Sequence, residues 1–387
     1  MSGIQGVVDP RFERLGQIFE ELFASGKDVG ASIAVTYKGE LVVDSWGGYM
    51  DAGMTKPWRQ ETISNVFSSG KTLIALSALL LVDRGLIDVD KPVAKYWPEF
   101  AKNGKSEVLV RHLMSHSAGL MGWDKPFLHR DLFDWEKATS VLAAQEPWFK
   151  PGTRSGYHLM SYGYLVGELV RRVSGYMPHQ FLQAEFSDLV KNDFYFGIPD
   201  SELERYAAFI PPDMKLPGWV GTVANSEVGR KVLGLQLKTI VSPQNDGTNS
   251  DPDRIRTDVP SAAIGNARGL ARIQSIIVNH GVVDGKQYLT DDTIDKIFRV
   301  QSDGRDAFFR RPLKWGIGYA LARPGSSEDV GGRVAYWHGY GGSRILCAVD
   351  KNCTFSYVMN KGLPGLLGDE RGEALSRALA VDLAAIR

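Results

Sequence analysis

An apolar run from Leu73 to Leu81, headed by Ser68-Ser69-Gly70-Lys71, constrains this chain more than any other stretch. The run predicts a buried helix that ends at Arg84 and Gly85, because a basic residue followed by glycine is the usual C-terminal stop. A spacing of three residues places Ser68 and Lys71 on one face of that helix. An amine buried by the surrounding apolar turns can take the proton of a hydroxyl, which predicts a serine acyl enzyme. An N-cap serine beside a lysine that reaches solvent is the competing interpretation.

Length and charge exclude several classes of protein. The chain has 387 residues, enough for a sizeable core and for two lobes within one catalytic unit. Its 45 basic and 45 acidic side chains leave no net charge to attract nucleic acid or an anionic membrane. We therefore expect a small, uncharged or weakly charged substrate.

The N-terminal residues and the cysteines indicate the compartment. Residues 1–10 have neither a charged leader nor an apolar export core, and no apolar run approaches the roughly 18 residues of a membrane helix. Cys347 and Cys353 flank a turn at Asp350-Lys351-Asn352, and a hairpin there places Cys347 nearer Phe355 than Cys353. The sequence thus predicts a cytoplasmic protein without a disulfide and without a membrane partner.

Strand patterns cluster at both ends of the chain, and helical patterns fill the middle. The expected strands are residues 31–37, 41–46, 315–322, 334–337, 344–349 and 354–359. The expected helices are residues 11–24, 108–114, 139–144, 160–173 and 369–386. Residues 211–260 are rich in Pro, Gly and Asp and predict a long loop.

This order of elements predicts an α+β fold in which the first and last segments share one antiparallel sheet flanked by helices. The predicted α/β domain comprises residues 1–75 and 255–387. Residues 76–254 form the inserted, mainly helical domain with the long loop.

A tyrosine is the expected partner of the Ser68–Lys71 pair. The sequence lacks Gly-x-Ser-x-Gly, so lysine must do the work that histidine does in α/β-hydrolases. A lysine is protonated at neutral pH unless burial or a nearby cation lowers its pKa. A tyrosine is also protonated at neutral pH and cannot act as a base unless a neighbouring ammonium favours its phenolate. Tyr157 follows the turn Pro151-Gly152-Thr153 and precedes a helix that begins near Met160, so its ring can project toward Ser68. The alternative is that Tyr157 only lines the wall of the site and takes no part in the reaction.

Four motifs in this order resemble the serine β-lactamase superfamily, with the β-lactamase/transpeptidase-like fold of class C β-lactamases. They are Ser68 to Lys71, Arg111 to Leu120, Tyr157-His158, and Trp337 to Ser343, and the likeness extends from about Gly30 to Met359. The chain most resembles the family VIII carboxylesterases of that superfamily.

The resemblance implies a role for each matched residue. Ser68 is the expected nucleophile, Lys71 the amine that activates it, and Tyr157 the general base and acid partner. The backbone N–H groups of Ser68 and Tyr340 are the expected oxyanion donors. Trp337-His338-Gly339 stands where β-lactamases carry Lys-Thr-Gly, on the strand beside the nucleophile.

Two departures from the β-lactamase pattern decide the predicted substrate. Trp337 and Leu159 occupy the places of the strand lysine and of an amide side chain that hold a β-lactam drug. Apolar groups there favour neutral, hydrophobic acyl groups, so we expect a carboxylesterase acting on small-molecule esters, with feeble β-lactam turnover. A shift of one residue in this alignment would bring His338, rather than Trp337, nearest Ser68; a histidine bonded to a neighbouring carbonyl is the simpler role.

Other functions share the same first step or the same scaffold. An acyltransferase would pass the acyl group to an alcohol or amine of a polyketide-like acceptor. A weak β-lactamase or peptidase, and a catalytically silent binding protein, are further alternatives. The sequence predicts no cofactor and no nucleic-acid partner, and it leaves the oligomeric state open.

Several remaining motifs have structural interpretations. His112 and His116 have zinc-compatible spacing, but no third ligand is spaced with them, so capping and turn roles are expected, and no metal. Trp123, Trp148 and Trp219 are candidates for an aromatic acyl pocket or for the core.

Overall fold

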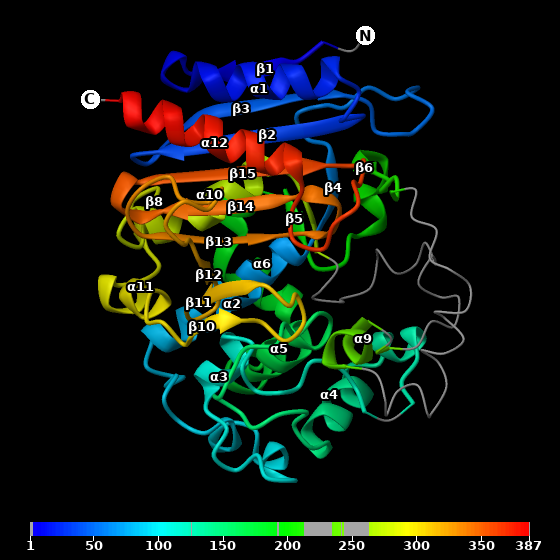
Figure 1. Cartoon of the computed structure of the whole chain (residues 1–387), viewed down its shortest axis with the longest axis vertical. Coiled ribbons are helices and arrows are strands. Elements are labelled where there is room, and N and C mark those ends of the chain that lie inside the picture. The colour runs from blue at the N-terminus through cyan, green and yellow to red at the C-terminus, as the bar shows by residue number, and fades with distance from the viewer. Residues whose placement is uncertain are drawn as a thin grey trace.

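The computed structural model describes residues 3–124, 126–191, 193–212, 234–240, 242–243 and 263–386. Its main feature is a nine-stranded antiparallel sheet in the order β1-β3-β2-β15-β14-β13-β12-β11-β10 (Figure 1). In that order the strands are Gln5–Val8, Glu40–Gly48, Gly30–Tyr37, Cys353–Met359, Arg344–Ala348, Val334–His338, Ala320–Leu321, Pro312–Trp315 and Ser302–Arg305.

The first and last segments of the chain meet inside this sheet. Strand β2 pairs with β15 in antiparallel register, from Ala31 opposite Met359 to Tyr37 opposite Cys353. Every residue of β2 is buried, because helices cover both faces of the sheet. The predicted α+β fold, with one sheet shared by both ends of the chain, is confirmed.

Helices α1 (Glu13–Ala24) and α12 (Glu370–Ala385) pack on one face of the sheet, and α10 (Ala267–Val278) packs on the other (Figure 1). The two faces of β2 belong to different apolar clusters, since Ile33 packs with α1 and α12 whereas Ala34 packs with α10. Alternate side chains of one strand therefore tie both helical layers to the sheet.

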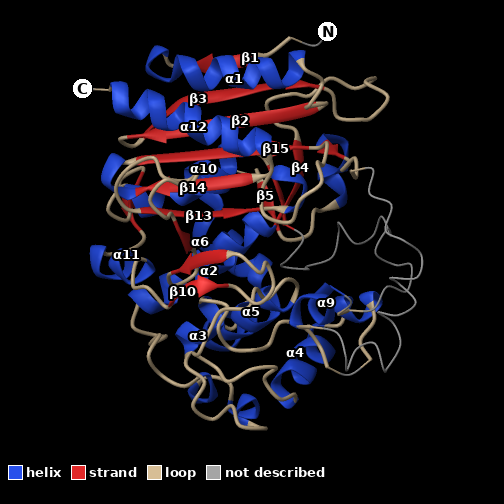
Figure 2. Ribbon diagram, in the orientation of Figure 1, coloured by secondary structure: helices blue, strands red, loops and turns tan. Residues whose placement is uncertain are grey.

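The other helices gather at the far side of the molecule from β1 (Figure 2). They are α2 (Lys71–Asp83), α3 (Val110–Met114), α4 (Trp135–Ala144), α5 (Ser161–Ser174), α6 (Pro178–Val190) and α9 (Leu235–Ile240). Helix α11 (Asp291–Ile297) lies beside α2. Short 3-10 helices occur at Pro10–Phe12, Val93–Lys95, Pro98–Ala101, His129–Phe133, Asp200–Arg205 and Val349–Lys351.

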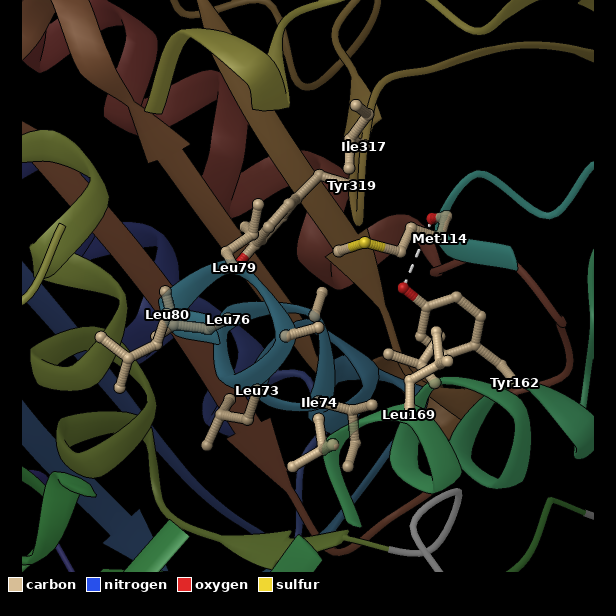
Figure 3. Close-up of a cluster of buried hydrophobic side chains, with 14 of the residues drawn as sticks. Leu73, Ile74, Leu76, Leu79, Leu80, Met114, Tyr162, Leu169, Ile317 and Tyr319 are labelled. Atoms are coloured by element: carbon tan, nitrogen blue, oxygen red, sulfur yellow. Dashed lines mark hydrogen bonds between the residues drawn. The ribbon is translucent and has the colours of Figure 1, made fainter. Parts of the chain in front are cut away.

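Helix α2 forms the centre of the helical part. Residues 71–82 are all buried, as the apolar run predicts. Figure 3 shows Leu73, Ile74, Leu76, Leu79 and Leu80 of α2 facing residues of other elements. The neighbouring residues include Tyr162 and Leu169 of α5, Met114, Ile317 and Tyr319.

A second, smaller sheet carries the chain into α2. Its strand order is β5 (Phe194–Tyr195), β7 (Ala263–Gly265), β4 (Ile63–Phe67) and β6 (Tyr206–Ala207). The sequence did not predict this sheet, because strands of two or three residues are too short to show alternation. A two-stranded hairpin, β8 (Val282–Val283) with β9 (Lys286–Gln287), completes the described strands.

Some predictions of detail were wrong. The expected strand over residues 315–322 is two strands, since Gly316 and Gly318 form a turn that sets Trp315 opposite Ala320. Gly318 has φ +86°, and a Cβ on it would lie 2.7 Å from the Cβ of Ala75. Strand pairing sets Cys347 opposite Thr354, so the predicted register was off by one residue.

Further predictions concern the cysteines, the long loop and the domain boundary. Both cysteines are free, as expected, and the structure shows that both are buried. Helix α9 lies within the predicted loop, and most of the rest of residues 211–260 lies outside the described residues. Trp219 and the boundary at residue 254 lie outside them too, so the division into two domains stays a proposal. Among the described residues, no helix has the length and apolarity needed to cross a membrane.

Candidate active site

A strained turn presents Ser68 at the junction of the two sheets and the helical part. Strand β4 ends at Phe67, and Ser68 opens the 3-10 helix η2 (Ser68–Gly70) that runs into α2. Phe67 has φ +46°, a conformation that costs a non-glycine residue on the order of 1–3 kcal/mol and is concentrated at functional sites. Gly70 is required by packing, because a Cβ there would lie 2.2 Å from the Cβ of Ala263 in β7.

Lys71 lies directly against the Ser68 hydroxyl. The Lys71 Nζ donates to Ser68 Oγ at 2.8 Å, because residues i and i+3 are eclipsed on a 3-10 turn. Only 2% of Lys71 is exposed, and burial lowers its pKa to about 7. Near neutral pH a large fraction of this amine is unprotonated and able to accept a proton.

Tyr157 completes the cluster from the loop before α5. Its phenol lies close enough to Ser68 for the serine hydroxyl to act on the tyrosine pKa. The Nζ of Lys71 lies 5.2 Å from the centroid of the tyrosine ring. The indole Nε1 of Trp337 donates to the phenolic oxygen at 3.0 Å. Burial raises the pKa of Tyr157, so this side chain is a phenol at neutral pH rather than the phenolate that an adjacent ammonium would favour.

The backbone amides of Ser68 and Tyr340 are held on neighbouring turns. Tyr340 opens the 3-10 helix η9 (Tyr340–Gly342), so both amides are first in a helix and lack an intrahelical acceptor. Ser343 joins the two turns, because its Oγ donates to Val66 O at 2.7 Å and lies 3.0 Å from Ser69 Oγ. Such a pair of amides can stabilise negative charge that develops on a substrate oxygen.

Packing and neighbouring charged side chains account for Gly339 and His338. A Cβ on Gly339 would lie 2.2 Å from Val66 O, so the close approach of the turn after β13 to β4 requires glycine. His338 lies 3.4 Å, Nε2 to Oε1, from the buried carboxylate of Glu328, which Arg344 also contacts at 3.3 Å. Burial and the Arg344 charge lower the pKa of His338 to about 4. Trp337 is thus the residue of this strand that contacts Tyr157, and His338 faces a carboxylate rather than the expected carbonyl.

The remaining histidines near the site bond to the backbone. His112 Nδ1 accepts from Leu109 N at 3.2 Å, and His116 Nδ1 accepts from His158 N at 3.1 Å. His158 Nε2 accepts from Leu120 N at 3.2 Å. Among the described residues, no group of three or more His, Cys, Asp or Glu side chains is arranged to hold a metal.

Aromatic side chains that the sequence did not single out surround Tyr157. Phe308 and Phe309 lie 5.8 and 5.0 Å from its ring, and Trp315 lies 6.2 Å away, measured between centroids. Their only sequence signal is a pair of phenylalanines in an otherwise polar segment. The contact between this segment and the Tyr157 loop could not be predicted from the sequence, because it joins parts of the chain about 150 residues apart.

The described residues predicted to line an acyl pocket lie in two different apolar clusters. Trp123 stacks on Phe127 at 4.5 Å and is a core residue of the helical part. Trp148 and Leu159 lie partly buried at the edge of the apolar cluster that contains Tyr157.

The fold and the Ser–x–x–Lys turn place this chain among the serine hydrolases of the β-lactamase superfamily. It belongs to the Beta-lactamase family, whose model matches residues 15–380. Esterase/beta-lactamase LipL of Mycobacterium tuberculosis is 30% identical over 372 residues, covering 95% of this chain and 85% of the relative.

Solved structures agree with this placement. A crystal structure of a family VIII carboxylesterase superposes with a TM-score of 0.86 at 32% identity, covering 98% of this chain and 100% of the other. A penicillin-binding protein homologue from Caulobacter crescentus superposes with a TM-score of 0.85 at 31% identity, with 98% and 100% coverage.

Proposed function

We propose that this protein is a serine carboxylesterase that forms an acyl-enzyme at Ser68. The observation that carries the proposal is the buried amine of Lys71, which has a pKa lowered to about 7 and lies 2.8 Å from the Ser68 hydroxyl. A serine hydroxyl is a weak nucleophile without such a base. A silent binding protein would have no use for a desolvated amine at this position.

In the first half-reaction, unprotonated Lys71 takes the proton of Ser68 while Oγ bonds to the ester carbonyl carbon. The carbonyl electron pair moves to oxygen, where the N–H groups of Ser68 and Tyr340 stabilise the negative charge. The intermediate collapses, the bond to the alcohol oxygen breaks, and that oxygen takes the phenolic proton of Tyr157. The Lys71 ammonium returns a proton to Tyr157, so the alcohol leaves and both side chains regain their starting states.

In the second half-reaction, water enters the position that the alcohol has left and attacks the acyl-enzyme. Water loses a proton to the same Lys71–Tyr157 pair as it attacks the acyl carbon, and Ser68 Oγ is reprotonated as it leaves. The carboxylic acid product is released. The raised pKa of Tyr157 keeps its proton in place at neutral pH, so Tyr157 cannot be the initial base and that role belongs to Lys71. The leaving alkoxide is basic enough to take the phenolic proton.

The substrate proposed is an ester of a small, neutral or hydrophobic acid. The indole N–H of Trp337 is already donated to Tyr157, and the Leu159 side chain has no hydrogen-bonding group. Neither side chain can therefore bind a substrate carboxylate or amide. The esterase names of LipL and of the family VIII structure support the same class.

Acyl transfer to an alcohol or amine is the second candidate. Both Lys71 and Tyr157 are at least 98% buried, and a site that restricts water gives another acceptor the chance to compete. We also propose a cytoplasmic location, which the two free, buried thiols of Cys347 and Cys353 support.

Hydrolysis of p-nitrophenyl butyrate tests the proposal. We expect turnover by the native protein, background rates with Ser68→Ala, and nitrocefin turnover far below ester turnover. Added 1-butanol separates the two candidates, because an acyltransferase gives mainly butyl butyrate and a hydrolase gives mainly butyric acid. Equal rates for the native protein and Ser68→Ala would overturn the assignment.

A further inference from the structure

The tip of the β10–β11 hairpin is fastened to the loop that carries Tyr157. Ala307 N donates to Ser155 O at 2.9 Å, and Tyr157 N donates to Asp306 Oδ1 at 3.3 Å. Gly156 lies in a crowded place between them, since a Cβ there would lie 2.7 Å from Met121 Sδ and 3.3 Å from the Cβ of Ala307. The hairpin tip and Tyr157 therefore keep a fixed relation to each other.

Asp306 also fixes the two phenylalanines that follow it. Its Oδ1 accepts from Phe308 N at 2.9 Å and from Phe309 N at 3.1 Å, and the side chain is fully buried. Asp306 O accepts from Arg310 N at 2.9 Å, which closes the turn. One carboxylate oxygen thus orders the tip and binds it to the Tyr157 backbone.

The two rings differ in exposure. Phe308 is fully buried and packs edge-on against Phe309, with ring centroids 4.9 Å apart. Phe309 is only partly buried, and its ring lies 5.0 Å from Tyr157 and 6.0 Å from Trp337. Phe309 is therefore the member of the pair that is both partly exposed and close to the phenol.

We propose that Phe309 lines the pocket for the alcohol part of the ester and selects aromatic alcohols over small aliphatic ones. The inference rests on the proposed function, in which Tyr157 gives its proton to the leaving oxygen. That oxygen must come within hydrogen-bond distance of the Tyr157 hydroxyl, so the group attached to it lies against the neighbouring side chains. A ring contact there favours an aromatic leaving group by up to about tenfold.

Two ester series separate the alcohol pocket from the acyl pocket. The first compares benzyl butyrate with ethyl butyrate, and the second compares ethyl hexanoate with ethyl acetate. Phe309→Ala should lower the benzyl to ethyl ratio of kcat/KM about five- to tenfold and leave the hexanoate to acetate ratio unchanged. Phe309→Leu, which keeps apolar bulk without the ring, should give an intermediate benzyl to ethyl ratio and serves if the alanine variant folds poorly.

Phe133→Ala is the matched control, because Phe133 is a 36% exposed phenylalanine in the 3-10 helix His129–Phe133 and should change neither ratio. An unchanged benzyl to ethyl ratio in both Phe309 variants would overturn the inference, as would a change confined to the acyl series. A native protein that hydrolyses none of the four esters would instead sink the proposed esterase function.

Discussion

Lys71→Met should abolish ester hydrolysis and at the same time stabilise the folded protein. Burial lowers the pKa of Lys71 from 10.5 to about 7, so the unfolded chain holds this proton more tightly than the folded one does. At about 1.4 kcal/mol per pH unit, the amine costs the fold about 4 kcal/mol near pH 7. Methionine keeps the apolar stem and gives up one hydrogen bond to Ser68, worth about 1 kcal/mol. The expected net gain is about 3 kcal/mol near pH 7.

The sign of the pH dependence follows from the same two values. Between pH 7 and 10.5 the folded chain has released the Lys71 proton and the unfolded chain has not, so native stability rises with pH. The advantage of the methionine variant should therefore shrink by about 1.4 kcal/mol per pH unit over that range.

Urea unfolding followed by tryptophan fluorescence, at pH 6.5 and 9.5, measures both effects. Lys91→Met removes an exposed lysine and should leave the free energy of unfolding nearly unchanged at both pH values. A Lys71→Met variant that is less stable than the native protein at pH 6.5, or that shows the same offset at both pH values, would refute the reasoning.

Three further predictions concern the site. Esterase kcat/KM should rise with pH through about 7 and then level off as Lys71 loses its proton, and a flat profile from pH 5.5 to 8.5 would contradict this. Trp337→Phe removes the N–H bond to Tyr157 and should lower kcat by about tenfold with little change in melting temperature, whereas an effect on KM alone would exclude a role in catalysis. Gly70→Ala forces a contact with Ala263 and should destabilise the fold by about 1–3 kcal/mol, which a native melting temperature would disprove.

The sequence predicts the overall fold correctly where its apolar or alternating patterns extend over many residues. The buried helix α2 is apolar on all sides, and the strands at both ends of the chain alternate over five or more residues. The small sheet around β4 was not readable, because three of its four strands have two or three residues. Tertiary contacts stabilise such strands, and those contacts leave no local period.

The site was readable only where its residues are close in sequence or belong to a recognised motif. Ser68 and Lys71 are neighbours on one turn, so their contact follows from spacing. The Trp337 bond to Tyr157 and the Asp306 bonds to its loop cross about 180 and 150 residues, and single-sequence patterns carry no information on them. Burial lowered the pKa of Lys71, as expected, but it raised the pKa of Tyr157, so Tyr157 stays a phenol rather than the expected phenolate.

The covalent step at Ser68 is the central claim, and intact-protein mass spectrometry with a p-nitrophenyl phosphonate tests it most directly. The phosphonate keeps the tetrahedral adduct on the nucleophile and cannot be hydrolysed as an ester acyl group is. We expect one added phosphonyl group on the native protein and none on Ser68→Ala, which lacks only one oxygen atom. An adduct of equal yield on Ser68→Ala, or no adduct on a native protein that still hydrolyses esters, would contradict it.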